Sequence, residues 1–218
     1  MSLRKVEFAE GEYYHTYNRG NSKQVIFHDK EDYDRFIKLI FLSNGRESFK
    51  IYFIKDDVYS TNRGNNLVNI GAYCLMPNHF HLLLAQVDEG GISKFMQKVS
   101  TGYSMYYNNK YRRTGTLFEG KFKSEHADSD RYLKYLFSYI HLNPVKLIDK
   151  EWKEKGIKDI SKAFKHLENY EYSSYQDYLG YNRNQKSIIN PETFPSYFSK
   201  SDLFKEEILD WLSYNQVS

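Results

Sequence analysis

The alternation of apolar and polar positions predicts strands and helices from the beginning of the chain. Aromatic residues alternate in EYYHTYN (12–18), which predicts a strand, and the turn-forming residues NRGN follow it. Apolar side chains at helical spacing predict a helix over DKEDYDRFIKLIFLSN (29–44), whose acidic first turn suits the positive end of the helix dipole. The segment FKIYFI (49–54) is typical of a second strand.

Two further apolar runs predict a β-hairpin. The runs LVNIGAYCLM (67–76) and HFHLLLAQ (79–86) have the length and composition of buried strands. Little more than Pro77 and Asn78 separates them, and both residue types suit a tight turn.

The next part of the chain predicts two helices joined by a basic loop. One helix is expected over 91–113, although Gly102 weakens its middle. The segment TGTLFEGKFKSEH (114–126) interrupts the helical pattern with two glycines. A second helix is expected over 128–144, where Pro144 enforces its end.

The order of these elements predicts an α+β domain in which helices cover an antiparallel sheet. We expect this domain to occupy residues 1–150. Residues 151–218 are more polar and less periodic, and they predict a mostly helical C-terminal extension that includes the amphipathic segment 201–214.

Charge and composition narrow the function classes. The formal net charge is only +3, but six positive side chains and one negative side chain lie between Lys98 and Lys123. Such a concentration suits contact with nucleic-acid phosphates. The single cysteine, Cys74, lies in an apolar run, where a small buried side chain is expected. No run approaches the roughly 20 apolar residues that span a bilayer, so we expect a cytoplasmic protein without a membrane partner.

Two histidines stand one residue apart in the second strand of the predicted hairpin. Because side chains alternate along a strand, His79 and His81 project on the same side and can share one metal ion. Hydrogen bonds within the core are the alternative role for such a pair. Hydrolases with three alternate histidines are another possible class, but Leu83 occupies the third position.

A nucleophile and a third metal ligand are expected on the last predicted helix. Tyr139 and Asn143 are four residues apart and therefore lie on one helical face. If that face covers the histidines, the amide oxygen of Asn143 can complete a metal site and Tyr139 lies beside it. Tyr103, Tyr106 and Tyr107 are rival nucleophiles, although their spacing also fits packing against the sheet.

Several motifs in this order resemble the HUH single-tyrosine transposases, and in particular the REP-associated tyrosine transposases. They are MPNHFHLLL (76–84), GTLFEGKFKS (115–124) and YLKYLFSYIHLNPVK (132–146). The segments YHTYNRGN (14–21) and YEYSSYQDYLG (170–180) extend the resemblance.

The resemblance implies a ferredoxin-like domain that binds single-stranded or hairpin DNA. It implies a nucleoid-associated enzyme that cleaves one strand to a 5′-phosphotyrosine and a free 3′-hydroxyl. It assigns Tyr139 as the nucleophile and His79, His81 and Asn143 as ligands of Mg²⁺ or Mn²⁺. Two imidazoles and one amide favour Mn²⁺ for tight occupancy.

A basic set of residues is expected to contact DNA, with aromatic residues interleaved for base stacking. The set consists of Arg19, Lys110, Arg112, Arg113, Lys121 and Lys123. A solvated surface loop is the alternative. Many relatives have glutamine and arginine where this chain has Glu119 and Lys121, and lysine lacks the bidentate fork of arginine.

Two other functions compete with the strand transferase. The first is a DNA-hairpin binding protein that keeps the fold without turnover. The second is a metal-dependent hydrolase of small phosphoesters, which would act without DNA. The sequence leaves open whether the protein is a monomer or a homodimer.

Overall fold

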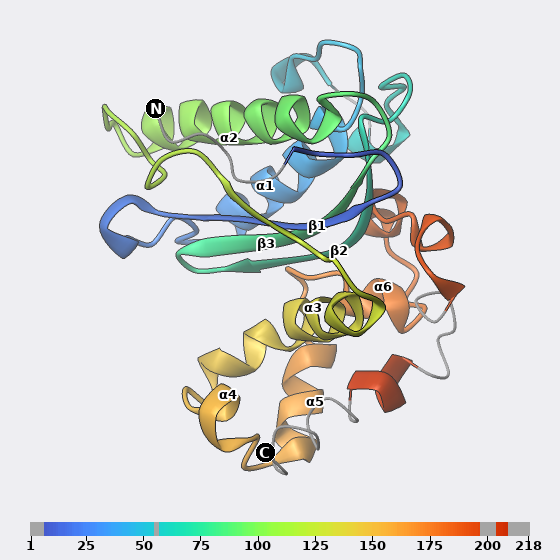
Figure 1. Ribbon diagram of the computed structural model, residues 1–218. Helices are drawn as coiled ribbons and strands as arrows, with labels where there is room; N and C mark the ends of the chain where they lie inside the picture. The colour runs from blue at the N-terminus through green and yellow to red at the C-terminus, as the bar shows by residue number, and fades with distance from the viewer. Residues whose placement is uncertain (1–6, 55–56, 197–203, 209–218) are drawn as a thin grey trace.

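The computed structural model describes residues 7–54, 57–196 and 204–208, which surround a four-stranded antiparallel sheet (Figure 1). Its strands, in the spatial order β2-β3-β1-β4, are β1 (Tyr13–Arg19), β2 (Val68–Met76), β3 (His79–Gln86) and β4 (Lys123–His126). The helices within the described ranges include α1 (Lys30–Ser43), α2 (Gly91–Lys110), α3 (Asp130–Leu142), α4 (Trp152–Lys155), α5 (Ile160–Glu168) and α6 (Tyr175–Tyr178). The order β1-α1-β2-β3-α2-β4 confirms the predicted ferredoxin-like α+β fold.

Helices cover both faces of the sheet. Helices α1 and α2 lie on one face, and α3 with the C-terminal helices lies on the other (Figure 1). On the α1 and α2 face, the ring of Phe36 packs against Phe80 and Tyr103 at centroid distances of 4.8 and 5.0 Å. Gly102 of α2 faces α1, and a Cβ there would lie 3.1 Å from the side chain of Leu39. The glycine therefore permits close approach of the two helices.

The predicted β-hairpin is confirmed. Strands β2 and β3 pair antiparallel, with Met76 opposite His79 across the turn. The turn carbonyls are bonded to the segment after β1: the Gly20 amide donates to Asn78 O at 2.9 Å, and the Ile26 amide donates to Pro77 O at 2.8 Å. These bonds fix the hairpin tip, where the first histidine lies, against the end of β1.

The predicted helices begin at side-chain caps. Asp29 accepts a hydrogen bond from the Asp32 amide at the start of α1, and Ser129 accepts one from the Tyr132 amide at the start of α3. Helix α3 ends at Leu142, and Pro144 belongs to the short 3-10 helix Asn143–Leu147. Proline has no backbone N–H, so Pro144 cannot continue the hydrogen bonding of the α-helix, although Asn143 itself has helical backbone angles.

The prediction of a strand at 49–54 is wrong. Residues Ile51–Phe53 form a 3-10 helix, and the side chains of Tyr52 and Phe53 are 89% and 67% exposed. The outer edge of β2 is occupied instead by the C-terminal region: the Leu75 amide donates to Tyr172 O and the Ser174 amide donates to Tyr73 O. The edge groups are thus paired by residues distant in the sequence.

The fourth strand is β4, which lies in the segment predicted as a basic loop. Its sequence KSEH contains no large apolar residue, so it lacks the hydrophobic alternation that marks a half-buried strand. It is held by pairing with β1, where Tyr14 lies opposite His126 and Tyr17 lies opposite Lys123.

The C-terminal region is mostly helical, as predicted, and packs against the sheet edge and α3. Of the predicted amphipathic segment 201–214, residues 204–208 are described and the rest lies outside the described residues. Phe204 is buried, and its ring lies 5.7 Å from that of Phe137 on α3. Among the described residues, no helix combines the length and apolar character needed to cross a bilayer.

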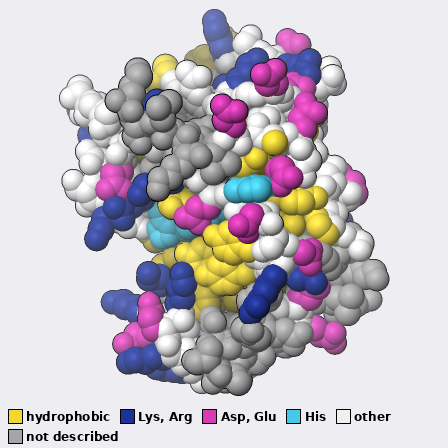
Figure 2. Space-filling model, in the orientation of Figure 1, with side chains coloured by type: hydrophobic (Ala, Val, Ile, Leu, Met, Phe, Trp, Pro, Cys, Tyr) yellow, Lys and Arg dark blue, Asp and Glu magenta, His cyan; other side chains and the backbone are white. Residues whose placement is uncertain are grey.

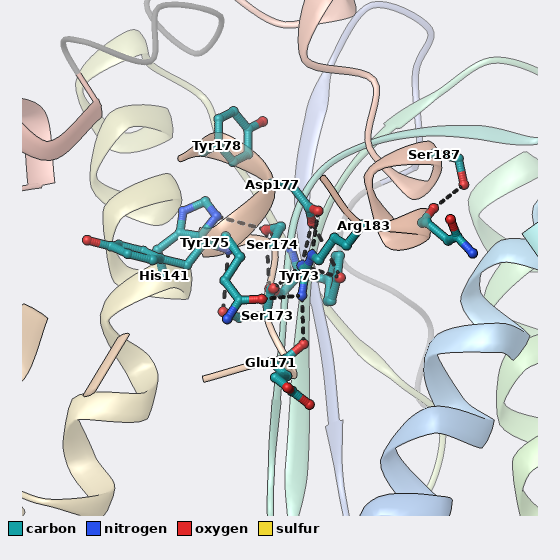
Figure 3. A network of polar contacts seen from close by, with 12 residues as sticks. Tyr73, His141, Glu171, Ser173, Ser174, Tyr175, Asp177, Tyr178, Arg183 and Ser187 are labelled. Atoms are coloured by element: carbon teal, nitrogen blue, oxygen red, sulfur yellow. Dashed lines mark hydrogen bonds and ion pairs between the residues drawn. The ribbon is translucent and has the colours of Figure 1, made fainter. Parts of the chain in front are cut away.

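A buried polar network fastens this region to β2 (Figure 3). Arg183 forms two 2.6 Å bonds with the carboxylate of Asp177 and donates to Tyr73 Oη at 3.0 Å. It also donates to the carbonyl oxygens of Ser173 and Glu171. The network joins strand β2, helix α6 and the segment after α6, so the extension is part of the same packed structure.

Candidate active site

Strand register gathers polar side chains on one face of the sheet. Tyr17 on β1 lies directly opposite His81 on β3, and His15 lies opposite Glu125 on β4. Residues paired in this way, and residues two apart on a strand, share a face. His15, Tyr17, His79, His81 and Glu125 therefore project toward the layer that contains α3.

Helix α3 places Tyr139 over these histidines. The half-buried Tyr139 ring lies edge-on to His81 at a centroid distance of 5.5 Å and to His15 at 6.2 Å. Asn143, one turn later, is 4% exposed, and its side chain contacts His79. The structure thus brings together His79, His81, Tyr139 and Asn143 within a single chain.

The hydrogen bonds of His79 determine which ring nitrogen faces the site. The Asn78 amide nitrogen donates to Lys23 O at 3.2 Å, which directs the Asn78 oxygen toward His79 Nδ1, 2.6 Å away. Nδ1 therefore carries the proton and donates it to this oxygen. The lone pair lies on His79 Nε2, the form in which an imidazole binds a metal.

His81 presents a buried nitrogen that has no partner among the described residues. Its Nδ1 lies 2.8 Å from His15 Nε2, whereas its Nε2 is buried without a hydrogen-bond partner. A buried polar atom without a hydrogen-bond partner destabilises the fold unless a ligand, such as a metal ion, binds it. Burial lowers the pKa of His79 to about 4 and that of His81 well below its usual range, so both are neutral at neutral pH.

These donors fit a divalent ion with a mixed nitrogen and oxygen ligand set. Within the described residues, no three His, Cys, Asp or Glu side chains are grouped to hold a metal. The fit therefore rests on the unpartnered Nε2 of His81, the Nε2 lone pair of His79 and the amide of Asn143 in contact with His79. The Asn143 Nδ2 lies 3.5 Å from Tyr139 O, which leaves the amide oxygen as the potential ligand.

The rival tyrosines of α2 lie on the opposite face of the sheet (Figure 1). Tyr103 is fully buried and donates to Ile26 O at 2.5 Å, and burial raises its pKa far above the usual value. Tyr106 donates to Asp32 at 3.0 Å, and Tyr107 is 3% exposed. Their packing role in the core agrees with the helical stripe that they extend.

Two of the basic residues expected to contact DNA are engaged by carboxylates. Arg19 forms an ion pair with Glu119. Lys110 lies within 3.0 Å of carboxylate oxygens of Asp29, Glu31 and Asp32. These contacts join α2 to the start of α1, so Lys110 has a structural role whatever else it contacts.

The other four basic residues lie close together in the chain, three between α2 and β4 and Lys123 at the start of β4. Arg112, Lys121 and Lys123 are exposed. The half-buried Arg113 places its guanidinium 5.4 Å from the centroid of the Tyr107 ring. Lys123 lies opposite Tyr17, on the same face as the histidines.

Three residues beside the site were not identified from the sequence. His15 contacts His81, Glu125 lies next to His15, and Lys153 of α4 places its Nζ 4.6 Å from the centroid of the Tyr139 ring. One feature of the sequence pointed to His15: His15 and Tyr17 have the same one-residue spacing as His79 and His81. Lys153 brings a positive charge from the C-terminal region to the site.

Histidine and acidic side chains lie near one another across the middle of the face in Figure 2, above a hydrophobic surface and beside lysine and arginine side chains. Acidic groups beside the imidazoles include Glu125, whose carboxylate accepts from Tyr17 Oη at 2.8 Å and from Tyr132 Oη at 2.9 Å. Burial together with Glu125 raises the pKa of Tyr17 to about 12, and the neighbouring Tyr139 adds to this shift.

Comparisons with known proteins give a family and a fold for this chain. A solved structure described as "Structure of the REP associates tyrosine transposase bound to a REP hairpin" matches with a TM-score of 0.53 and 13% sequence identity. The match covers 85% of this chain and 90% of that chain, so the two share a fold. No curated protein sequence matches. The family described as "Transposase IS200 like" matches residues 12–143, which include His79, His81, Tyr139 and Asn143, and the chain belongs to this family.

Proposed function

We propose that this protein is a DNA strand transferase that cleaves single-stranded or hairpin DNA through a 5′-phosphotyrosine on Tyr139. The observation that carries the proposal is the position of the Tyr139 ring, 5.5 Å from an imidazole whose buried Nε2 has no partner among the described residues. The catalytic domain of the proposal is residues 1–150, with residues 151–218 as its extension.

The proposed reaction exchanges one phosphoester for another. The Tyr139 oxygen forms a bond to phosphorus and releases its phenolic proton, while the bond to the 3′ oxygen breaks and that oxygen takes up a proton to become the free 3′-hydroxyl. Attack by another 3′-hydroxyl reverses these changes and rejoins two strands. Mg²⁺ or Mn²⁺ held by His79, His81 and Asn143 would polarise the phosphate and orient it for in-line displacement.

The surrounding residues support this chemistry through position and charge. His79 and His81 are neutral and have their Nδ1 atoms engaged, so their Nε2 atoms face the site. Lys153 places a cation against the Tyr139 ring, where it favours a negatively charged phenol oxygen or phosphate. The hydrophobic face of α3 fixes the helix that carries the nucleophile, because Leu136 and Ile140 are buried.

The proposal is tested by incubating the protein with hairpin-bearing single-stranded DNA and Mn²⁺, then separating products on a denaturing gel. We expect a protein-linked oligonucleotide that EDTA prevents. Retarded DNA on a native gel without any covalent product would instead identify a hairpin-binding protein. Hydrolysis of a small phosphodiester in the absence of DNA would identify a hydrolase.

Replacing His81 with alanine should weaken Mn²⁺ binding by about 100-fold or more, since it removes a metal ligand, and the hydrogen bonds that orient such ligands are alone worth about 10- to 100-fold. The measurement is calorimetric titration of the DNA-free protein. His126→Ala is a matched control, because His126 is also on the sheet but bonds to Glu12, away from the site. Equal Mn²⁺ affinities for the two variants would contradict the metal assignment.

DNA binding should depend on salt through the exposed basic residues. Removing the charges of Lys121 and Lys123 should reduce the slope of log affinity against log salt by about 0.7 for each phosphate of single-stranded DNA that is no longer neutralised. Fluorescence anisotropy at several salt concentrations measures the slope. Lys155→Ala is the control, because Lys155 of α4 pairs with Glu151, the residue before that helix. A slope unchanged by the double substitution would remove these lysines from the interface.

A further inference from the structure

We propose that His15 and Glu125 are positioning residues that hold His81 in one tautomer, with the proton on Nδ1 and the lone pair on Nε2. The inference deepens the proposed function, because it explains how His81 is prepared for a metal ion. It concerns three side chains from three strands, His15 on β1, His81 on β3 and Glu125 on β4.

The contact between the two histidines permits only one proton between them. His15 Nε2 and His81 Nδ1 are 2.8 Å apart, and the rings stack at a centroid distance of 5.0 Å with an interplanar angle of 22°. Both residues are buried, at 4% and 6% exposure. In neutral imidazoles one of these nitrogens must donate and the other accept, so the direction of this bond sets both tautomers.

Glu125 decides the direction. Its carboxylate accepts hydrogen bonds from the hydroxyls of Tyr17 and Tyr132, and it lies 3.9 Å from His15 Nδ1. These contacts, with that to His15 the largest, lower the pKa of Glu125 to about 2, so it is ionised at neutral pH. At 3.9 Å this contact is an electrostatic one and not a hydrogen bond, and His15 Nδ1 is buried without a hydrogen-bond partner among the described residues. The negative charge of the carboxylate favours a proton, and not a lone pair, on this nitrogen.

A proton on His15 Nδ1 leaves His15 Nε2 as the acceptor. His81 Nδ1 then donates to it, and the lone pair of His81 falls on Nε2. The opposite arrangement would turn the lone pair of His15 Nδ1 toward a carboxylate. It would also place an N–H on His81 Nε2, which is buried and has no hydrogen-bond partner among the described residues. His15 Nδ1 also lacks a hydrogen-bond partner there, but an N–H on it faces the Glu125 carboxylate 3.9 Å away.

His79 is held in the same tautomer, with its proton on Nδ1, by a different hydrogen-bond partner. Asn78 accepts from His79 Nδ1, so both histidines direct an Nε2 lone pair to the Tyr139 side. For His81 the orienting group is a second imidazole backed by a carboxylate. Such contacts fix ring orientation and raise the basicity of a metal-binding histidine.

Nitrogen-15 NMR of histidine-labelled protein tests the inference without metal or DNA. We expect His81 in the wild-type protein to show a protonated Nδ1 and an unprotonated Nε2 at neutral pH. His15→Leu and Glu125→Ala should each convert this signal to a mixture of tautomers or to the Nε2-protonated form. His126→Gln, which alters another imidazole bonded to a carboxylate on the sheet, should leave it unchanged.

Mn²⁺ affinity supplies a second readout. His15→Leu should weaken binding about 10- to 100-fold, and His15→Gln should recover part of it, because a glutamine oxygen can accept from His81 Nδ1. Glu125 is on the exposed edge strand, so Glu125→Ala keeps the test available if the buried substitution prevents folding.

The outcomes separate this inference from the proposed function. An Nε2-protonated His81 in the wild-type protein, or a His81 tautomer unaffected by both His15→Leu and Glu125→Ala, would overturn the positioning role. If His81 has its proton on Nδ1 but the protein forms no DNA adduct, the proposed strand-transferase activity would be wrong and the positioning role would stand.

Discussion

Tyr139→Phe should abolish the covalent DNA adduct while leaving hairpin binding and stability nearly unchanged. The substitution removes one oxygen and keeps the ring that contacts His81, His15 and Tyr135. Since no other group would supply the attacking oxygen, strand cleavage should fall by at least about 10³-fold. Denaturing gels measure the adduct, anisotropy measures binding, and thermal unfolding verifies the fold.

The matched control is Tyr135→Phe. Tyr135 lies one turn earlier on α3, and its ring stacks on that of Tyr139 at a centroid distance of 5.8 Å. Removal of its hydroxyl should leave adduct formation within a few-fold of wild type. An adduct that persists at wild-type yield in Tyr139→Phe would show that another residue attacks the phosphate.

Asp177→Ala should destabilise the protein by about 3–5 kcal/mol, because it leaves the guanidinium of Arg183 buried without its carboxylate. The Asp177 side chain is fully buried and that of Arg183 is 13% exposed. Arg183 also bonds to Tyr73 on β2, so the loss should loosen the C-terminal region from the sheet edge (Figure 3). At roughly 2–4 °C per kcal/mol, the melting temperature should fall by about 6–20 °C.

An exposed ion pair provides the comparison. Lys155, the last residue of the short helix α4, lies 2.9 Å from Glu151, the residue before that helix, and both side chains are at least half exposed. Glu151→Ala should therefore change stability by no more than about 0.5 kcal/mol. Similar losses for Asp177→Ala and Glu151→Ala would mean that the buried network does not fasten the extension.

Local patterns were sufficient to predict β1, α1, the β2-β3 hairpin, α2 and α3. Each has strong periodicity over many residues, and α1 and α3 also have a cap. The segment 49–54 has the composition of a strand but contains a 3-10 helix, and the edge of β2 bonds instead to residues 172–174. That pairing joins residues about 100 positions apart and leaves no local pattern in the sequence.

The proximity of the candidate site residues was predictable where they share one element. The spacing of His79 and His81 on a strand, and of Tyr139 and Asn143 on a helix, is sufficient to pair them. His15 and Glu125 could not be placed beside His81 from spacing, because their proximity depends on the register of three strands.

The carboxylate partners of Arg19 and Lys110 could not be predicted from the sequence either, because they are distant along the chain and meet only in the fold. Glu119 lies 100 positions from Arg19, and Asp32 lies 78 positions from Lys110. A count of positive charges along the sequence therefore overstated the number of side chains left for phosphate. The exposed Arg112, Lys121 and Lys123 are the stronger candidates for DNA contact.

Mapping the covalent adduct by mass spectrometry tests the central claim most directly. After cleavage of hairpin DNA in Mn²⁺, nuclease digestion and trypsin, the peptide 135–146 contains both Tyr135 and Tyr139. We predict fragment ions that place a 5′-linked nucleotide phosphate on Tyr139. A nucleotide on Tyr135, on a tyrosine of α2 or on no tyrosine would contradict the account.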